Sequence, residues 1–460
     1  MASKLISDER IQPLNDKTVQ DGQHVLYWMQ QSQRAEDNHA LEYAIQQAND
    51  LGLPLLVVFG LMDDYPEANL RHYTFMLEGL QDTQQALKRR GIKMVVQHGK
   101  PDEVAIKNAH EAALVVCDRG YLRHQRAWRE NVANEVPCQV VQVESDVVVP
   151  VETTSNKAEY AARTIRPKIH KHLEDFLVEL TTTPLENASL EMDVSGLDLS
   201  DIAALTDTLK LDRSVGAVGM FTGGTTQAKT ILRRFLDEKF ATYDDNRNQP
   251  HTDDVSHMSK YLHFGQISPV YLAMQIREAG AERVGKENID SYIEELTVRR
   301  ELAMNFVYFT PDNYDSFDCL PNWAQKTLGE HDDDAREYLY DQQQLEDAET
   351  HDEYWNAAMK EMRYTGYMHN YMRMYWGKKI LEWSPNPREA YRRTLDINNK
   401  YFLDGRDPNS FGNVAWVFGL HDRAWTERAV YGKVRYMAAS GLKRKTKPEQ
   451  YVAKVEELIR

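Results

Sequence analysis

The sequence predicts an α/β domain followed by a domain made mostly of helices. Up to about residue 150, short apolar runs rich in β-branched residues alternate with stretches of helical spacing. After about residue 225, apolar residues recur mostly with helical spacing and strand-like runs disappear. A chain of 460 residues is also longer than one hydrophobic core usually supports, so we expect two domains.

Five apolar runs are expected to be strands, at residues 24–29, 54–61, 92–99, 113–118 and 138–149. Between them, helical spacing is found at 37–50, 69–90, 101–111 and 123–134. Strands that alternate with helices form a parallel sheet covered on both faces, so we predict a five-stranded parallel sheet. Such a sheet binds ligands beyond the carboxyl ends of its strands. No GxGxxG or Walker A motif identifies a nucleotide.

These patterns divide the chain into four parts. We expect an N-terminal extension at 1–20, the α/β domain at 21–152, an interdomain linker at 153–212 and the helical domain at 213–460. The linker leads from the sheet into a helix, and then through the polar stretch "TTTPLENASLEMDVSGLDLSD", whose proline and glycine break helices.

The composition indicates a globular protein, with 42% hydrophobic and 27% charged residues. No apolar run approaches the roughly 20 residues that span a bilayer, and the N-terminus has no apolar signal core. The three cysteines are far apart and odd in number, which favours reduced thiols and a cytoplasmic protein. The net charge of −16 argues mildly against DNA binding, but basic stretches at 391–394 and 442–447 leave room for a local basic face.

Two polar segments have either a capping or a binding interpretation. "GGTTQAKTIL" opens with glycines and a threonine that suits a helix start. In "DVSHMSKYLHFGQIS", Ser256 and Ser259 lie near a predicted helix start. Hydroxyls and free backbone N–H groups at such a place cap the helix or hold a phosphate, and residue types alone favour capping.

The segment "EELTVRRELAMNF" also has two interpretations. Glu295 and Arg299 are four residues apart and suit an ion pair on a helix surface. Alternatively, Glu295 is a carboxylate in a cleft that hydrogen-bonds a polar ligand.

An aromatic helix is predicted at 354–383. Trp376 and Trp383 are seven residues apart, which places them on one helix face about 10.5 Å apart along its axis. Such a stripe is usually core, and the alternative is that the indoles serve a redox cofactor.

The stretch "YFLDGRDPNSFGNVAW" is a polar, glycine-containing elbow in a helical domain. Arg373, on the aromatic helix, is placed to pair with Asp404 on the elbow. A buried pair of this kind is costly unless both groups are well satisfied, and its usual setting is a site. Gly405 suits a tight backbone turn that lets a planar ligand approach, with Trp416 beyond it.

Together these segments resemble the class II DNA photolyases, which repair cyclobutane pyrimidine dimers with light. The resemblance spans about residues 25–440, and the motifs that carry it are "YWMQQSQRAEDNHAL", "RHYTFMLEGL", "KAEYAARTIRPK", "YLHFGQIS", "EELTVRRELAMNF", "MHNYMRMYWGKKILEW", "YFLDGRDPNSFGNVAW" and "HDRAWTERAVYGKVRYM". It implies a Rossmann-like α/β antenna domain and an all-α domain that holds a U-shaped FAD.

The resemblance also implies which residues serve the FAD. The phosphates and ribityl chain would be contacted by Tyr243, Val255, Ser256, Met258 and Ser259. The isoalloxazine would lie beside Arg373, Asp404 and Gly405, with Asn398 near its N5. The tryptophans that photoreduce the flavin would be Trp355, Trp376 and Trp383.

On the DNA side, the resemblance implies a lesion pocket of Glu295, Asn370, Met374 and Trp416. Arg247 and Arg423 match positive residues that face DNA. At Arg299 some family members have a tryptophan stacked on the dimer and others share the arginine, which would stack on a base or meet a phosphate.

The implied activity is light-driven electron transfer from reduced FAD to a flipped-out dimer in double-stranded DNA, by a monomer with no metal site and no membrane. The first alternative is a cryptochrome-type blue-light receptor, against which Glu295, Met374 and Trp416 argue. A (6-4) photolyase would need a histidine pair in the pocket, where His369 is near, and a generic flavin oxidoreductase would need a nicotinamide site. The antenna chromophore is left open: an 8-hydroxy-deazaflavin type, a folate, or none.

Overall fold

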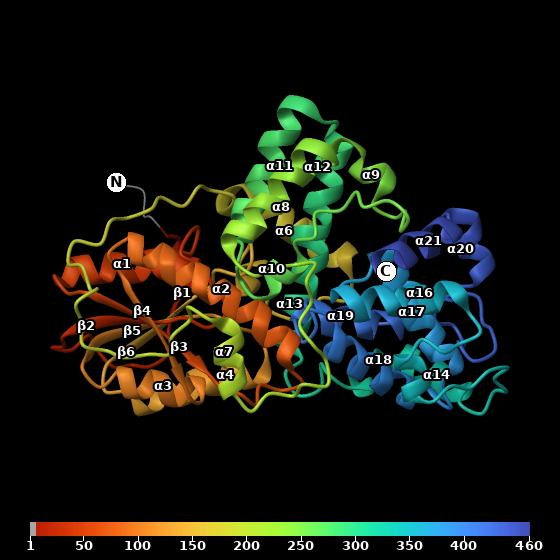
Figure 1. Cartoon of the computed structure of the whole chain (residues 1–460), viewed down its shortest axis with the longest axis horizontal. Helices are drawn as coiled ribbons and strands as arrows, with labels where there is room; N and C mark the ends of the chain where they lie inside the picture. Colours follow the sequence, from red (N-terminus) through yellow and green to blue (C-terminus); the bar gives the residue numbers. More distant parts are fainter. Residues whose placement is uncertain (1–5) are drawn as a thin grey trace.

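A computed structural model describes residues 6–460 (Figure 1). Its single sheet contains the five predicted strands, as β2 (His24–Trp28), β3 (Leu55–Leu61), β4 (Lys93–His98), β5 (Ala112–Asp118) and β6 (Gln139–Val143). These five are parallel, in the order β6-β5-β2-β3-β4. The sheet carries a sixth strand, β1 (Ile11–Pro13), which pairs antiparallel with the edge strand β6.

The prediction of five strands is therefore wrong by one, and β1 lies in the segment expected to be a loose extension. Three residues, Ile-Gln-Pro, give too short a pattern to recognise, and a proline is tolerated because β1 is an edge strand. The buried guanidinium of Arg10 fastens this segment by donating to the carbonyl oxygens of Glu144 (2.9 Å) and Val147 (3.1 Å).

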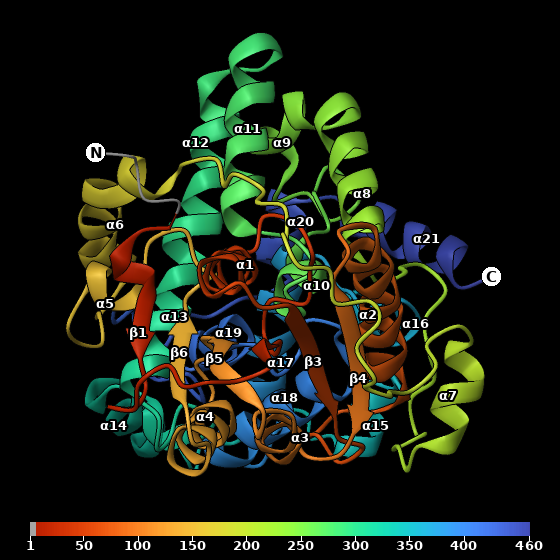
Figure 2. The same ribbon diagram turned by 90° about the vertical axis from the view of Figure 1, so that its left-hand side faces the viewer.

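Four helices cover the sheet, as their spacing predicts: α1 (His39–Leu51), α2 (Leu70–Arg89), α3 (Pro101–Asn108) and α4 (Arg123–Glu135). Alternate residues of the strands face opposite ways. Val25, Tyr27 and Val57 pack against α1 and α2, whereas Leu26 and Val58 pack against α3 and α4. Figure 2 looks at the sheet with α1 and α2 on one side and α3 and α4 on the other.

The segment expected to link the domains has two structured ends. It begins with α5 (Val151–Thr154) and α6 (Ala162–Phe176), and it ends near α7 (Ile202–Thr208). Ile165 and Ile169 of α6 pack in the helical core, while Leu205 of α7 packs on the α/β core. The segment thus contributes to both cores, and the division into domains stays a prediction.

After β6 the described chain forms helices, loops and one isolated bridge between Arg428 and Gly432. The longer helices are α8 (Thr225–Glu238), α11 (Pro269–Arg283), α12 (Lys286–Ile293), α13 (Arg300–Phe309), α14 (Asn322–Glu330), α16 (Glu353–Thr365), α17 (Asn370–Trp383), α18 (Pro387–Tyr401), α19 (Pro408–Val417) and α21 (Pro448–Leu458). Shorter ones are α9 (Tyr243–Asn246), α10 (Ser259–His263), α15 (Gln342–Glu346) and α20 (Ala439–Lys445), and a π-helical turn at Glu294–Arg299 leads into α13. Among the described residues, no helix is long and apolar enough to cross a membrane.

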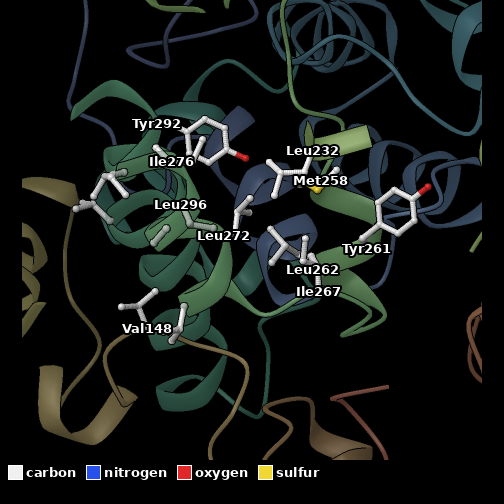
Figure 3. Close-up of a cluster of buried hydrophobic side chains, with 14 of the residues drawn as sticks. Val148, Leu232, Met258, Tyr261, Leu262, Ile267, Leu272, Ile276, Tyr292 and Leu296 are labelled. Carbon is white, nitrogen blue, oxygen red and sulfur yellow. The ribbon is translucent and has the colours of Figure 1, made fainter. Parts of the chain in front are cut away.

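The two parts of the chain share buried contacts. Figure 3 shows the apolar core to which α8, α10 and α12 contribute side chains. Val148, in the segment after β6, projects into this core. The buried carboxylate of Glu301, on α13, accepts hydrogen bonds from the backbone N–H groups of Val148 (2.5 Å) and Val149 (3.3 Å). Arg300 pairs with Asp146 at 3.0 Å. The sheet and the helices are therefore docked by satisfied polar groups as well as by apolar packing.

Candidate cofactor and substrate site

The centre of the candidate site is a two-pronged ion pair between α17 and the elbow at 402–407. Arg373 donates from its two terminal nitrogens to the two carboxylate oxygens of Asp404, at 3.0 and 3.1 Å. The guanidinium carbon lies 3.9 Å from the ring centroid of Phe402, so the pair stands on an aromatic ring. Burial acts to raise the pKa of Asp404, but Arg373, the Ser259 hydroxyl and Lys260 outweigh it and lower that pKa below its ordinary value. The predicted pairing is present.

The elbow differs in detail from the expectation. Its left-handed residue is Arg406 (φ 66°), not Gly405. A Cβ on Gly405 would lie 2.9 Å from the carbonyl oxygen of Asn398 and 3.0 Å from the Cα of Asn399. The close approach that requires glycine is thus to α18, and a ligand's approach to Gly405 stays a prediction. Arg406 is held in its conformation by its backbone N–H, which donates to Asn399 Oδ1 at 3.0 Å.

Asn398 is buried on α18, next to the elbow. Its side-chain N–H donates to Asn399 Oδ1 (3.0 Å) and to the Ser410 hydroxyl. These bonds orient the amide. Asn398 is on α18 and Asp404 is on the elbow that follows this helix, so neighbouring parts of the chain carry both residues.

The predicted phosphate loop precedes α10. Neither Ser256 nor Ser259 caps this five-residue helix, which starts after Met258 without a side-chain cap. Ser256 instead accepts a hydrogen bond from the Tyr292 hydroxyl at 2.8 Å, and Met258 is buried in the core of Figure 3. The capping interpretation of these serines is therefore wrong.

The contacts of three more residues from the predicted binding segments are as follows. Val255 is half-buried within the loop before α10, and Tyr243 is buried on α9 with its ring centroid 5.3 Å from that of Tyr292. Thr225 does not cap α8, because its hydroxyl donates to the carbonyl oxygen of Gln266 at 2.7 Å.

Lys260 is a buried cation that the sequence reasoning missed. Its ammonium group donates to the carbonyl oxygen of His257 (2.9 Å) and lies 3.6 Å from the ring centroid of Phe221. Burial lowers the pKa of Lys260 to about 7, against the attraction of Asp404. Nothing in "SKYLH" distinguishes this lysine from a surface one, because only the tertiary structure buries it.

The three predicted redox tryptophans are buried and form a row. The Trp376 ring lies 6.2 Å from that of Phe402, beside the ion pair. Trp355, on α16, donates its indole N–H to the Trp376 carbonyl oxygen at 3.0 Å, and its ring lies 5.6 Å from that of Trp383. Trp376 and Trp383 share a face of α17, as expected, and Trp355 contacts the backbone of Trp376 and the ring of Trp383.

Glu295 does not pair with Arg299. It pairs with Arg247, just after α9, at 2.9 Å, and Arg299 pairs with Glu294 at 3.0 Å. The reason is the π-helical turn Glu294–Arg299, in which residues five apart face each other instead of residues four apart. Such turns occur frequently at functional sites.

Of the remaining predicted substrate residues, Trp416 is on α19, and Asn370 and Met374 are on α17. Asn370 is exposed at the start of α17, and Met374 is half-buried one turn later. Lys378, buried on the same helix, brings its ammonium group within 5.2 Å of the Trp416 ring centroid. His369 caps α17 by accepting from the Tyr371 N–H at 3.2 Å.

A stack of cations and indoles extends from Trp416 to the surface. Arg435 lies 5.3 Å from the Trp416 ring and 4.3 Å from that of Trp425, and Arg423 lies 5.0 Å from the Trp425 ring. The Asp422 carboxylate accepts from Arg435 at 2.9 Å and fixes the stack. Trp425 is 37% exposed. The sequence reasoning named Arg423 only, although "DRAWTERAVYGKVR" interleaves basic and aromatic residues.

A cavity lies between the sheet and the helical part. Residues that follow β2 and β3 line one wall, among them Gln30, Gln33 and Met62. Arg406 and Asp407 of the elbow line the other. Its place at the carboxyl ends of parallel strands agrees with the rule for ligand sites in such sheets.

Comparison with known proteins adds a family. The DNA photolyase family profile matches residues 25–187. The chain is 50% identical to "Deoxyribodipyrimidine photo-lyase" of Methanothermobacter thermautotrophicus, over 99% of this chain and 100% of that one. It is 37% identical to the protein of the same name from Potorous tridactylus, over 96% and 83%.

Among solved structures, the fold is similar to that of an archaeal photolyase from Sulfolobus tokodaii, described with two FAD molecules. The TM-score is 0.69 at 17% sequence identity, and the match covers 94% of this chain and 89% of that one.

Proposed function

The chain belongs to the DNA photolyase family and is a light-dependent DNA-repair lyase of the deoxyribodipyrimidine photo-lyase type, and we propose that it splits cyclobutane pyrimidine dimers at the site around Arg373 and Asp404. The observation that carries this proposal is the half-buried, two-pronged pair of Arg373 and Asp404 on the Phe402 ring, with buried indoles nearby. Such a pair offers a donor and an acceptor to a polar ligand, and closely spaced indoles suit electron transfer.

The residues around the pair suit FAD. Arg373 and Asp404 offer a donor and an acceptor to the polar edge of a flavin ring, and Asn398 offers an oriented amide. Ser256, Ser259 and the Lys260 cation suit the phosphates, because neither serine is used as a cap. The indole N–H of Trp376 is buried without a protein partner, which is consistent with a missing polar neighbour. When bound, reduced and excited by light, FAD supplies the electron that opens the cyclobutane ring.

The protein's own work is to bind and orient the dimer. A dimer must leave the duplex stack to reach a pocket, and this costs a few kcal/mol, less for a damaged base. Trp416 would offer an indole face to it, and we assign Asn370 and Met374, on the helix whose Lys378 lies 5.2 Å from that indole, to the same pocket. Glu295 in its protonated form would donate a hydrogen bond to a pyrimidine carbonyl in place of its pair with Arg247, which would be released toward a phosphate.

The stack of Arg423, Trp425 and Arg435 is our candidate for the duplex contact. Guanidinium groups neutralise phosphates, and an exposed indole can stack on a base left unpaired by the flipped dimer. Arg299, about half exposed, belongs to the π-helical turn that carries Glu295, and we assign it to stacking on a base or binding a phosphate.

The finer assignments rest on the sequence motifs. We propose the class II subtype because the quoted motifs cover both halves of the chain. We propose that an antenna chromophore, either an 8-hydroxy-deazaflavin type or a folate, binds at the cavity between the sheet and the elbow, because its aromatic and amide lining suits a planar heterocycle. An absorption spectrum of native protein distinguishes these chromophores from none.

The repair assay is the direct test. Purified protein with reduced FAD is expected to restore thymine-dimer DNA under near-UV or blue light and not in the dark. A matched substrate with a (6-4) lesion should stay unrepaired. Equal amounts of product in light and dark would contradict the enzymatic mechanism, and light-induced flavin changes without any repair would favour the cryptochrome alternative.

A further inference from the structure

The row of aromatic rings continues beyond Trp383 to the surface. The ring centroid of Tyr340 lies 5.5 Å from that of Trp383, and that of His351 lies 5.2 Å from it. Tyr340 is also fixed to Trp383 by its backbone N–H, which donates to the Trp383 carbonyl oxygen at 3.2 Å. Tyr338 stacks on His351 at 3.7 Å and is 39% exposed, whereas Trp383 is 2% exposed. Ring contacts thus lead from a buried indole to solvent.

The hydroxyl of Tyr340 is held in a defined orientation. Its oxygen accepts a hydrogen bond from the backbone N–H of His351 (3.0 Å), and it lies 2.7 Å from His351 Nδ1. The hydroxyl donates to Nδ1 in the tautomer in which that nitrogen is unprotonated. A phenol and a base are in contact, next to the outermost indole.

We propose that Tyr340 is the terminal electron donor of this row and that His351 takes its proton. The inference rests on the proposed function, in which photoexcited oxidised flavin is the oxidant and draws an electron through Trp376 and Trp355 from Trp383. The Trp383 radical cation then takes one electron from Tyr340. The O–H bond of Tyr340 breaks, and the proton forms a bond to His351 Nδ1. The products are a neutral indole, a neutral tyrosyl radical and an imidazolium, so the single positive charge is conserved.

The surroundings favour this direction of transfer. The ammonium group of Lys379 lies 5.6 Å from the Trp383 ring centroid, and a cation there disfavours a second positive charge on the indole. Glu382, 2.6 Å from Lys379, offsets part of this effect. Tyr340 avoids the charge by releasing its proton, and His351 is exposed, so water solvates the new imidazolium. The electron vacancy moves away from the buried row.

Flash photolysis of the flavin-loaded protein tests the step. Transient absorption is expected to show a tryptophan radical that decays as a tyrosyl radical forms, more slowly in D2O because a proton moves. In Tyr340→Phe the tyrosyl signal should be lost and the tryptophan radical should persist. The matched control Tyr338→Phe removes a neighbouring hydroxyl that makes no contact with Nδ1, and it should keep the signal. A tyrosyl signal in Tyr340→Phe, or equal decay of the tryptophan radical with and without Tyr340, would overturn the proposal.

Two further measurements separate this inference from the proposed function. In the flavin-loaded protein kept in the dark, ¹⁵N NMR should show His351 Nδ1 unprotonated, with a shift in Tyr340→Phe; a protonated Nδ1 would refute the proton step. Trp376→Phe should abolish the tryptophan radical and flavin photoreduction. Normal photoreduction in Trp376→Phe would sink the tryptophan route itself. If Trp376→Phe blocks photoreduction as expected but no tyrosyl radical forms at Tyr340, this inference alone is rejected.

Discussion

At the scale of single residues, the site depends on charges that are paired but scarcely solvated. The side chains of Arg373 and Asp404 are 23% and 12% exposed, and each satisfies the other through two hydrogen bonds. Removing one partner of such a pair leaves the other without compensation, which costs more than the pair itself contributes. The charge of either residue therefore affects the stability of the structure around both.

Asp404→Asn should lower the free energy of unfolding by about 2–4 kcal/mol at pH 7, because it leaves Arg373 unpaired. The pKa of Asp404 is depressed in the folded state, so its charge contributes stability above the ordinary aspartate pKa. That contribution is lost as the pH falls through the depressed pKa, so the difference from wild type should shrink below about pH 4. Urea denaturation at several pH values measures it.

The control is another aspartate–arginine pair, Asp396 with Arg392, which lies on the surface of α18. Asp396→Asn should change stability by less than about 0.5 kcal/mol. A difference for Asp404→Asn that stayed constant from pH 7 to pH 3 would show that the carboxylate charge is not its cause.

At the scale of elements, two irregular turns position the site. The π-helical turn before α13 rotates Glu295 away from Arg299 and toward Arg247. The elbow after α18 places Asp404 on one side and Arg406, with its left-handed backbone, on the other. Regular helices in either place would have aimed these side chains elsewhere.

Gly405→Ala should destabilise the protein by about 1–3 kcal/mol, because its Cβ would press on backbone atoms that cannot yield. The elbow should shift and flavin binding should weaken. The control is Gly329→Ala in α14, where a Cβ meets nothing within 4 Å. There, alanine should raise the stability by up to about 1 kcal/mol. Thermal unfolding of both variants measures the two changes in stability, which should be opposite in sign. A Gly405→Ala variant as stable as wild type would contradict the packing argument.

At the scale of the whole molecule, the elbow lies between the candidate flavin site and the cavity beside the sheet. Asp404 faces the candidate flavin site, and Arg406 and Asp407 line the cavity against the sheet. Arg71 of α2 strengthens the same junction by donating to the carbonyl oxygens of Tyr401 (2.6 Å) and Met362 (3.1 Å). An antenna site and a reaction centre on either side of one elbow would be held at a constant separation.

The whole-molecule charge makes the DNA contact local. With a net charge of −16, binding should depend on the few arginines near Trp425, and affinity should fall with rising salt. Arg423→Ala should reduce the slope of log affinity against log salt by about one. Arg388→Ala, an arginine already paired with Asp318 at 2.9 Å, should leave the slope unchanged. Titration of labelled dimer DNA at several salt concentrations measures these slopes. Equal slopes for wild type and Arg423→Ala would exclude Arg423 from the contact.

The sequence by itself determined the parallel strands and their helices, because apolar periodicity reports which face is buried. It also indicated the pairing of Arg373 with Asp404 and the shared face of Trp376 and Trp383, since both follow from helical spacing and charge. Motif resemblance supplied the family, the flavin and the substrate.

Only the tertiary structure decided the rest. Strand β1 is too short to have a pattern, and it exists because β6 offers a free edge. The burial of Lys260 and the partner of Glu295 depend on elements distant in the chain or on a π-helical turn. The aromatic row from Trp376 to Tyr340 joins three separate segments. Contacts of this kind arise from packing, which a local periodicity does not encode.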